Sequence, residues 1–141
     1  MSESTTKSIA TATRNQQHKN ILICVYQYLF YLNSGEKPDI RGIVEETFHL
    51  PYADCDAFAK QALMQVVRHA QEAVNDIDPL LNQWKFERLG LIEQAILLMG
   101  YVYIKKLDFA PAIAIKIMVR LSQVFGESDS YRYINAVLEK V

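Results

Sequence analysis

The chain has 141 residues, of which 50% are hydrophobic and 22% are charged, with 15 Lys and Arg against 16 Asp and Glu. This length fits one compact domain, the hydrophobic content is typical of a folded globular protein, and the near-neutral balance excludes a polycationic nucleic-acid coat protein. No apolar segment reaches the ~18–20 residues that a membrane span needs, and the polar N-terminus lacks the apolar core of a signal peptide, so we expect a cytoplasmic protein.

Capping residues, turn residues and apolar repeats predict mostly helices. Residues 1–13 are rich in Ser and Thr and lack periodicity, which predicts a mobile tail before a single domain over residues 14–141. Apolar side chains then recur at three- and four-residue intervals, as one buried helix face requires. They predict five helices in this order, over about residues 15–32, 38–48, 55–75, 79–84 and 87–105.

The segment after the fifth helix has a mixed pattern. Residues 112–117 (AIAIKI) alternate and are rich in β-branched side chains, which alone predicts a strand. A cap at Asp108, Pro111 in a first turn and the helical spacing of the apolar residues that follow favour a sixth helix. A seventh helix begins after a cap at Ser128 or Asp129. The sequence therefore predicts an all-α bundle of about seven helices, without strands or internal repeats.

Motifs that carry catalysis, metal binding or nucleotide binding are missing from the sequence. The three histidines lie in no ligand spacing such as HExxH, and there is no GxxxxGK[ST], GxGxxG or GxSxG motif. Asp54 and Asp56 are better explained as caps of the third helix than as an acid–base pair. Cys24 and Cys55 form no CxxC motif, which favours two buried thiols over a disulfide. We expect no enzymatic activity, no metal site and no cofactor.

Charge is distributed unevenly along the chain. Residues 37–80 hold four basic and eight acidic side chains, whereas residues 81–141 hold eight basic and six acidic ones, and the first 36 residues hold three basic and two acidic ones. A protein that binds RNA with one surface and a basic protein with another would show such a division. Scattered solubility charges would produce it almost as readily.

Several blocks of the sequence occur in a characteristic order and spacing. Trp84 precedes residues 87–97 (ERLGLIEQAIL), residues 114–126 begin with Ala-Ile and end with Phe-Gly, and residues 129–138 are DSYRYINAVL. Gln27 with Leu-Phe two residues later occurs near the front of the chain. Together these blocks resemble the NusB transcription antitermination family, whose matching patterns are W…RL..IE.AIL, AINEAVELAK.FG, DS.KFVNGVL and QALY.

The resemblance covers residues 18–141 and is specific over residues 84–138. It implies an all-helical fold of two packed subbundles. It also implies a non-enzymatic function, which is binding of the boxA segment of single-stranded nascent RNA together with NusE, a small-subunit ribosomal protein. In the family this pair joins an antitermination complex on RNA polymerase and supports ribosomal RNA synthesis.

Family members hold RNA with an arginine-rich N-terminal segment and with the start of the last helix. Carried across by position, the resemblance implies these RNA-binding candidates: Arg14, His18, Lys19, Asp129, Arg132, Tyr133 and Asn135. Lys19 and Arg132 suit phosphates, and Tyr133 suits stacking on an unpaired base, which contributes about 1–3 kcal/mol. Core packing is the alternative for Tyr133. For Asn135 the favoured alternative is a buried amide that bonds backbone groups at a helix crossing.

The sequence departs from the family pattern in its basic segment, where Asn20, Ile21 and Leu22 stand at positions typical of basic or small residues. Each lost phosphate contact lowers both affinity and salt dependence. Two alternatives therefore stay open. One is a NusB-like protein-interaction module without RNA binding, including a homodimer, that works through the acidic middle. The other is a targeting domain like the NusB-like region of certain RNA methyltransferases, which requires a catalytic domain after Val141.

Overall fold

The computed structural model describes residues 3–82 and 84–141, without the side chains of residues 3–12, and this part of the chain contains helices, turns and loops but no strand. The predicted all-α class is confirmed. The α-helices of the described part are α1 (Glu3–Asn33), α2 (Ile40–Phe48), α3 (Ala57–Ile77), α4 (Leu91–Lys105), α5 (Pro111–Phe125) and α6 (Ser130–Lys140). Short 3-10 turns occur at Tyr52–Asp54, Asp78–Leu80 and Phe86–Arg88.

The two largest differences between the predicted and the observed helices concern residues 79–84 and the start of α1. The segment predicted over residues 79–84 is only the 3-10 turn Asp78–Leu80, which leaves six α-helices in the described residues instead of about seven. Helix α1 begins at Glu3, well before the predicted start near Asn15. The mobility predicted for residues 1–13 stays a prediction, because residues 1 and 2 and the side chains of residues 3–12 lie outside the described part of the chain.

The capping predictions have mixed outcomes. Asp56 is the N-cap of α3, and its Oδ2 accepts a hydrogen bond of 2.8 Å from the Ala59 N–H. Asp108 is not the cap of α5, because it lies in a left-handed turn with φ 59° and the helix starts after Ala110. Asp129 occupies the N-cap position of α6 in the left-handed region, with φ 70°, and its side chain makes no capping bond to the described backbone. A residue with positive φ therefore lies just before each of the last two helices, α5 and α6.

Helix α4 is the centre of the fold. Every residue from Glu93 to Tyr103 is buried, and α4 packs against α1, α3, α5 and α6. A helix that is apolar on all sides lies inside a bundle, and each large apolar side chain buried there stabilises the fold by about 1.5–3 kcal/mol. Gly100 permits the close approach of α6, since a Cβ at this position would lie 2.6 Å from Leu138 Cδ1.

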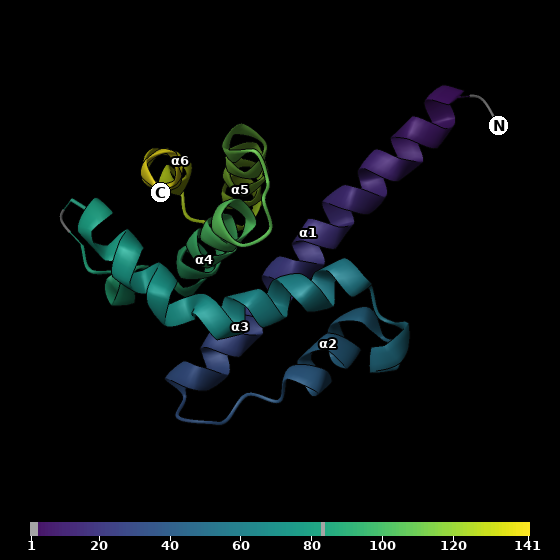
Figure 1. Ribbon diagram of the computed structural model, residues 1–141, viewed down its shortest axis with the longest axis horizontal. Coiled ribbons are helices and arrows are strands. Elements are labelled where there is room, and N and C mark those ends of the chain that lie inside the picture. Colours follow the sequence, from purple (N-terminus) through teal and green to yellow (C-terminus); the bar gives the residue numbers. More distant parts are fainter. Residues whose placement is uncertain (1–2, 83) are drawn as a thin grey trace.

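The helices form two packed subbundles. Helix α1 packs against both α2 and α3, helices α4, α5 and α6 pack on one another, and α4 joins the two groups through α1 and α3. Figure 1 shows α3 crossing in front of α1, with α5 and α6 on the far side of α4. This arrangement brings residues 14–19 of α1 beside α5, although almost 100 residues separate them in the sequence.

The interior also holds both thiols. Cys24 and Cys55 are free and buried, as the absence of a CxxC motif indicated. Burial raises the pKa of the Cys24 thiol, which keeps it protonated and unreactive. None of the helices in the described residues combines the length and apolar character that a membrane span requires.

Candidate nucleic-acid interface

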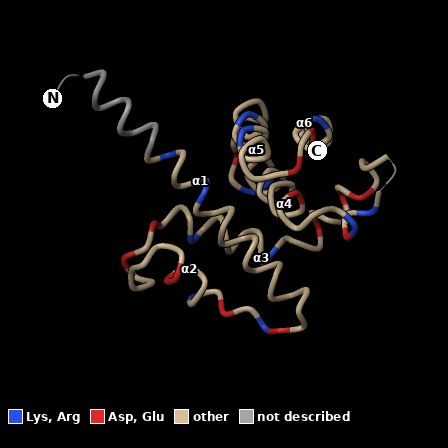
Figure 2. Tube along the Cα trace, turned by 180° about the vertical axis from the view of Figure 1, so that it is seen from behind, with Lys and Arg blue, Asp and Glu red and all other residues tan. Residues whose placement is uncertain are grey.

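A groove of about 620 Å³ lies between α1 and α5, and we call it the basic groove. Its cations are Arg14 and Lys19 from α1 together with Lys116 and Arg120 from α5. Among the described residues, no Asp or Glu lines it. Figure 2 shows Lys and Arg on both helices, α1 and α5. The basic groove therefore concentrates positive charge in a protein whose net charge is −1.

Helical spacing explains how the groove is built. Lys116 and Arg120 are four residues apart, so their side chains leave α5 on the same face. The groove is also lined by apolar side chains of α5, of which Ile113 and Val124 are 56% and 60% exposed. None of the ion pairs among the described residues involves a cation of the basic groove. Like charges one helical turn apart destabilise a helix slightly, so this charge has no structural benefit in the fold.

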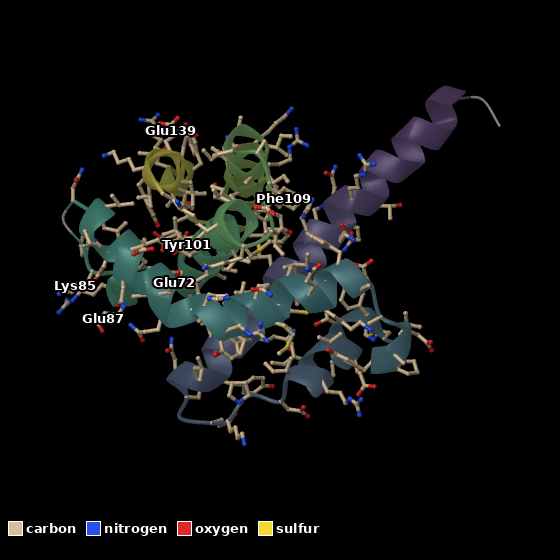
Figure 3. The ribbon with its side chains drawn as sticks, viewed as in Figure 1. Glu72, Lys85, Glu87, Tyr101, Phe109 and Glu139 are labelled. Atoms are coloured by element: carbon tan, nitrogen blue, oxygen red, sulfur yellow. The ribbon has the colours of Figure 1, made fainter. Side chains whose placement is uncertain are left out.

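His18 lies in the basic groove but is held by the interior. Its Nδ1 shares a hydrogen bond of 2.7 Å with Tyr103 Oη, and its ring centroid is 5.5 Å from that of Tyr103 and 6.4 Å from that of Phe58. Phe109, which lies between α1 and α5 in Figure 3, completes this cluster, and its ring centroid is 4.5 Å from that of Tyr103. Burial lowers the pKa of His18, so the ring is neutral near pH 7. His18 is suited to anchoring α1 on α4 and poorly suited to binding a phosphate.

Two of the predicted candidates form an exposed cluster at the start of α6. Arg132 Nε lies 3.9 Å from Asp129 Oδ1 and donates a hydrogen bond of 3.3 Å to Tyr131 Oη. The guanidinium carbon lies 5.7 Å from the centroid of the Tyr131 ring. These contacts, above all the hydrogen bond to Tyr131, raise the pKa of Arg132, which is 73% exposed. The cluster offers one cation and one aromatic ring to a ligand, with a carboxylate that partly offsets the charge.

Tyr133 faces a different groove from the other candidates. It is half-buried against the core and lines a groove of about 600 Å³, which we call the Trp84 groove after its most exposed aromatic side chain. Burial raises the pKa of Tyr133, and the carboxylates of Glu93 and Glu127 raise it further. The core-packing alternative thus describes part of the Tyr133 ring, while another part faces the groove.

Asn135 lies on the opposite side of α6. It is half-buried and lines a groove of about 600 Å³ between α5 and α6, which we call the α5–α6 groove. Its Nδ2 donates a hydrogen bond of 3.2 Å to Glu139 Oε1, and Figure 3 shows Glu139 on the outer side of α6. The expectation of a deeply buried amide bonded to backbone groups is wrong for Asn135.

The seven predicted candidates therefore occupy four places. Arg14, His18 and Lys19 are together in the basic groove, Asp129 and Arg132 form the α6-start cluster, and Tyr133 and Asn135 lie in one groove each. Lys116 and Arg120 were not among the predicted candidates. A signal for them exists, since they are two cations at helical spacing in a segment otherwise rich in apolar residues.

Comparison with known proteins gives a consistent result. The sequence model of the NusB family matches residues 19–141. The chain is 34% identical to the transcription antitermination protein NusB of Wolinella succinogenes over 128 residues, which are 91% of this chain and 93% of the relative. It is also similar to solved structures of T. maritima NusB and of antitermination factors NusB and NusE in complex with dsRNA.

The two solved structures agree with the fold described above. The similarity to T. maritima NusB has a TM-score of 0.73 at 18% identity, and it covers 90% of this chain and 88% of the other. The similarity to the complex has a TM-score of 0.72 at 22% identity, and it covers 90% and 93% of the two chains. At these identities the two similarities establish the fold.

Proposed function

The chain belongs to the NusB family, and we propose that it acts in transcription antitermination by binding boxA-type nascent RNA together with NusE. The proposed setting is an antitermination complex on RNA polymerase that supports ribosomal RNA transcription. The proposed RNA-binding residues are those of the sequence analysis, with His18 as an anchor of the groove and not as a charged contact.

The basic groove is the observation that carries this proposal. Phosphate contacts supply most of the affinity of RNA-binding proteins, and they come from Lys and Arg side chains that are not already paired with carboxylates. Arg14 and Lys19 are such cations, and the described residues that line their groove include no carboxylate. In the related NusB structure, the protein is in complex with NusE and dsRNA, which supports NusE and RNA as partners.

Two features of the chain predict a modest affinity for RNA alone. The groove has four cations, and the α6-start cluster adds Arg132, whose charge Asp129 partly offsets. A second protein that binds both this chain and the RNA raises the effective concentration of one for the other, so NusE is expected to tighten RNA binding. Dependence on NusE is therefore part of the proposal.

The test is a titration of the purified chain into labelled single-stranded boxA RNA at low salt, with and without the cognate NusE. We expect NusE to tighten binding at least about tenfold, with a smaller gain on a scrambled RNA of equal length. Fluorescence anisotropy gives both dissociation constants. If neither RNA nor NusE binds the chain at low salt, the proposed function is wrong for this protein.

A protein-interaction module without RNA binding is the second candidate. The Trp84 groove favours it, because Trp84 is 61% exposed there beside both basic and acidic side chains. Interfaces between proteins are often built on such aromatic side chains with a mixed polar rim. The same titration separates the two candidates, since the module predicts NusE binding with no RNA binding in either condition.

A further inference from the structure

The basic groove and the α5–α6 groove are neighbours that share one wall. Ala112, Lys116 and Arg120 line both grooves. The two cations are exposed and form a ridge along α5, with Arg14 and Lys19 on one side of it and Asn135 on the other. Neither cation belongs to the proposed RNA-binding set derived from the family pattern.

We propose that Lys116 and Arg120 bind successive phosphates of the RNA strand where it runs along α5, on the ridge between the basic groove and the α5–α6 groove. This inference rests on the proposed function, because it extends the path of the same RNA. It assigns α5 as a third contact segment, between the N-terminal part of α1 and the face of α6 that carries Asn135.

The spacing of the two cations suits a polynucleotide backbone. Four residues of α-helix rise about 6 Å along the axis, which is comparable to the separation of successive phosphates in an extended single strand. Each side chain therefore meets a different phosphate of one strand. Lys116 and Arg120 have no carboxylate partner among the described ion pairs, so their binding to phosphate breaks no existing ion pair.

The distribution of acidic side chains indicates where the proposed RNA strand leaves the protein. The basic groove has no acidic lining among the described residues, whereas the α5–α6 groove contains Glu139 beyond Asn135. Asn135 already donates to the Glu139 carboxylate, which would repel a phosphate placed further along. The strand is therefore expected to leave the protein near Asn135, while the exposed Ile113 gives sugars or bases an apolar surface within the basic groove.

Contacts to phosphates carry no sequence information, which makes this inference sharply testable. The test variant is K116Q/R120Q, which removes two charges and keeps similar side-chain sizes. Its matched control is K37Q/R68Q, which removes one Lys and one Arg from exposed positions that line neither groove. A second variant, K116R/R120K, keeps the charges and exchanges the head groups.

The measurement is anisotropy of labelled boxA RNA and of scrambled single-stranded RNA of equal length, with and without NusE, together with anisotropy of labelled NusE without RNA. We expect K116Q/R120Q to lower the affinity for both RNAs by the same factor, about tenfold at low salt. The slope of log affinity against log salt should become shallower by about 1.4. The control K37Q/R68Q and the charge-conserving K116R/R120K stay close to the parent chain. Thermal melting of all variants confirms that they are folded.

Four outcomes would overturn the inference. If the parent chain binds RNA and K116Q/R120Q matches the control, α5 lies outside the RNA path while the proposed function stands. If the variant weakens only boxA RNA, the cations contact bases and not the backbone. If the variant no longer binds NusE in the absence of RNA, while its RNA binding in the absence of NusE is unchanged, the ridge is a protein interface. If the parent chain binds no RNA, the inference and the proposed function are both wrong.

Discussion

The basic groove and the Trp84 groove have nearly the same volume, about 620 and 600 Å³, but their charged side chains differ in the contacts that they make. The charged side chains of the basic groove make no ion pair among the described residues. In the Trp84 groove, by contrast, Glu93 is 3% exposed and its Oε1 accepts a hydrogen bond of 2.7 Å from the Glu127 N–H. The described lining of the basic groove carries cations without a carboxylate, whereas the Trp84 groove combines Arg88 and Lys140 with carboxylates, one of which holds α4 to the α5–α6 connection.

This difference shows that the size of a groove does not identify its ligand. A phosphate-binding surface is identified by cations that have neither an ion-pair partner nor a carboxylate beside them, because a partner would have to be displaced and a nearby carboxylate repels the phosphate. A buried carboxylate that already accepts backbone hydrogen bonds is a structural group, and its loss is felt in stability. Substitutions in the two grooves should therefore affect different measurements.

The largest expected effect comes from removing all charge from the basic groove. The variant R14Q/K19Q/K116Q/R120Q should weaken boxA RNA binding on the order of 100-fold at low salt and lower the salt slope by about 3, since four phosphate contacts are lost. Its melting temperature should stay the same or rise slightly, because like charges have been removed from the helix faces. Anisotropy and thermal melting give the two results.

The matched comparison is R88Q/K140Q, which removes an Arg and a Lys from the Trp84 groove. We expect less than about a twofold change in RNA affinity for this variant. A loss of RNA affinity as large as that expected of K116Q/R120Q, which also removes one Lys and one Arg, would contradict the division between the two grooves and would place the RNA on the Trp84 side.

The next largest effect is expected on stability. Replacing Glu93 with Ala leaves the Glu127 N–H without its acceptor and should lower the free energy of unfolding by about 1–3 kcal/mol. Glu93→Gln keeps an acceptor oxygen and should lose less than half of that. Urea unfolding of both variants measures the difference. RNA affinity of folded Glu93→Ala should change less than about threefold, and equal stability of the two variants would rule out the structural role.

Sequence reasoning predicted the helices better than it predicted the site. Helix α4 is apolar on every side, and Pro111 begins α5 as expected, so local patterns were sufficient for these elements. Asp108 was assigned as a cap because acidic residues favour that position, but here the turn places it at positive φ before the helix begins. Such a turn depends on how the α4–α5 connection crosses the core, which no local pattern records.

The site depends on packing between distant segments. The family pattern selected Arg14 and Lys19, which lie in one groove, but it could not show that Lys116 and Arg120 line the same groove, because α1 and α5 meet only in the folded chain. The same pattern grouped Tyr133 with Asn135, which are two residues apart. On α6 such a separation turns the side chains by about 200°, so they face different grooves.

The smallest expected effect concerns His18, which lies in the basic groove but belongs to the interior. Burial lowers the pKa of His18 below the 6.5 of an unfolded chain, so between the two values the unfolded state binds more protons than the folded state. The contribution of His18 to stability is therefore complete above about pH 6.5 and falls as the pH drops toward the folded pKa.

Urea unfolding of the parent chain and of His18→Gln at pH 7.5 and pH 5.5 measures this contribution, and the variant controls for the other titrating groups. We expect the parent chain to lose more stability on acidification than His18→Gln. A parent chain that instead gained stability relative to the variant would mean that the fold stabilises protonated His18, and the neutral anchor assigned to it through Tyr103 would be wrong.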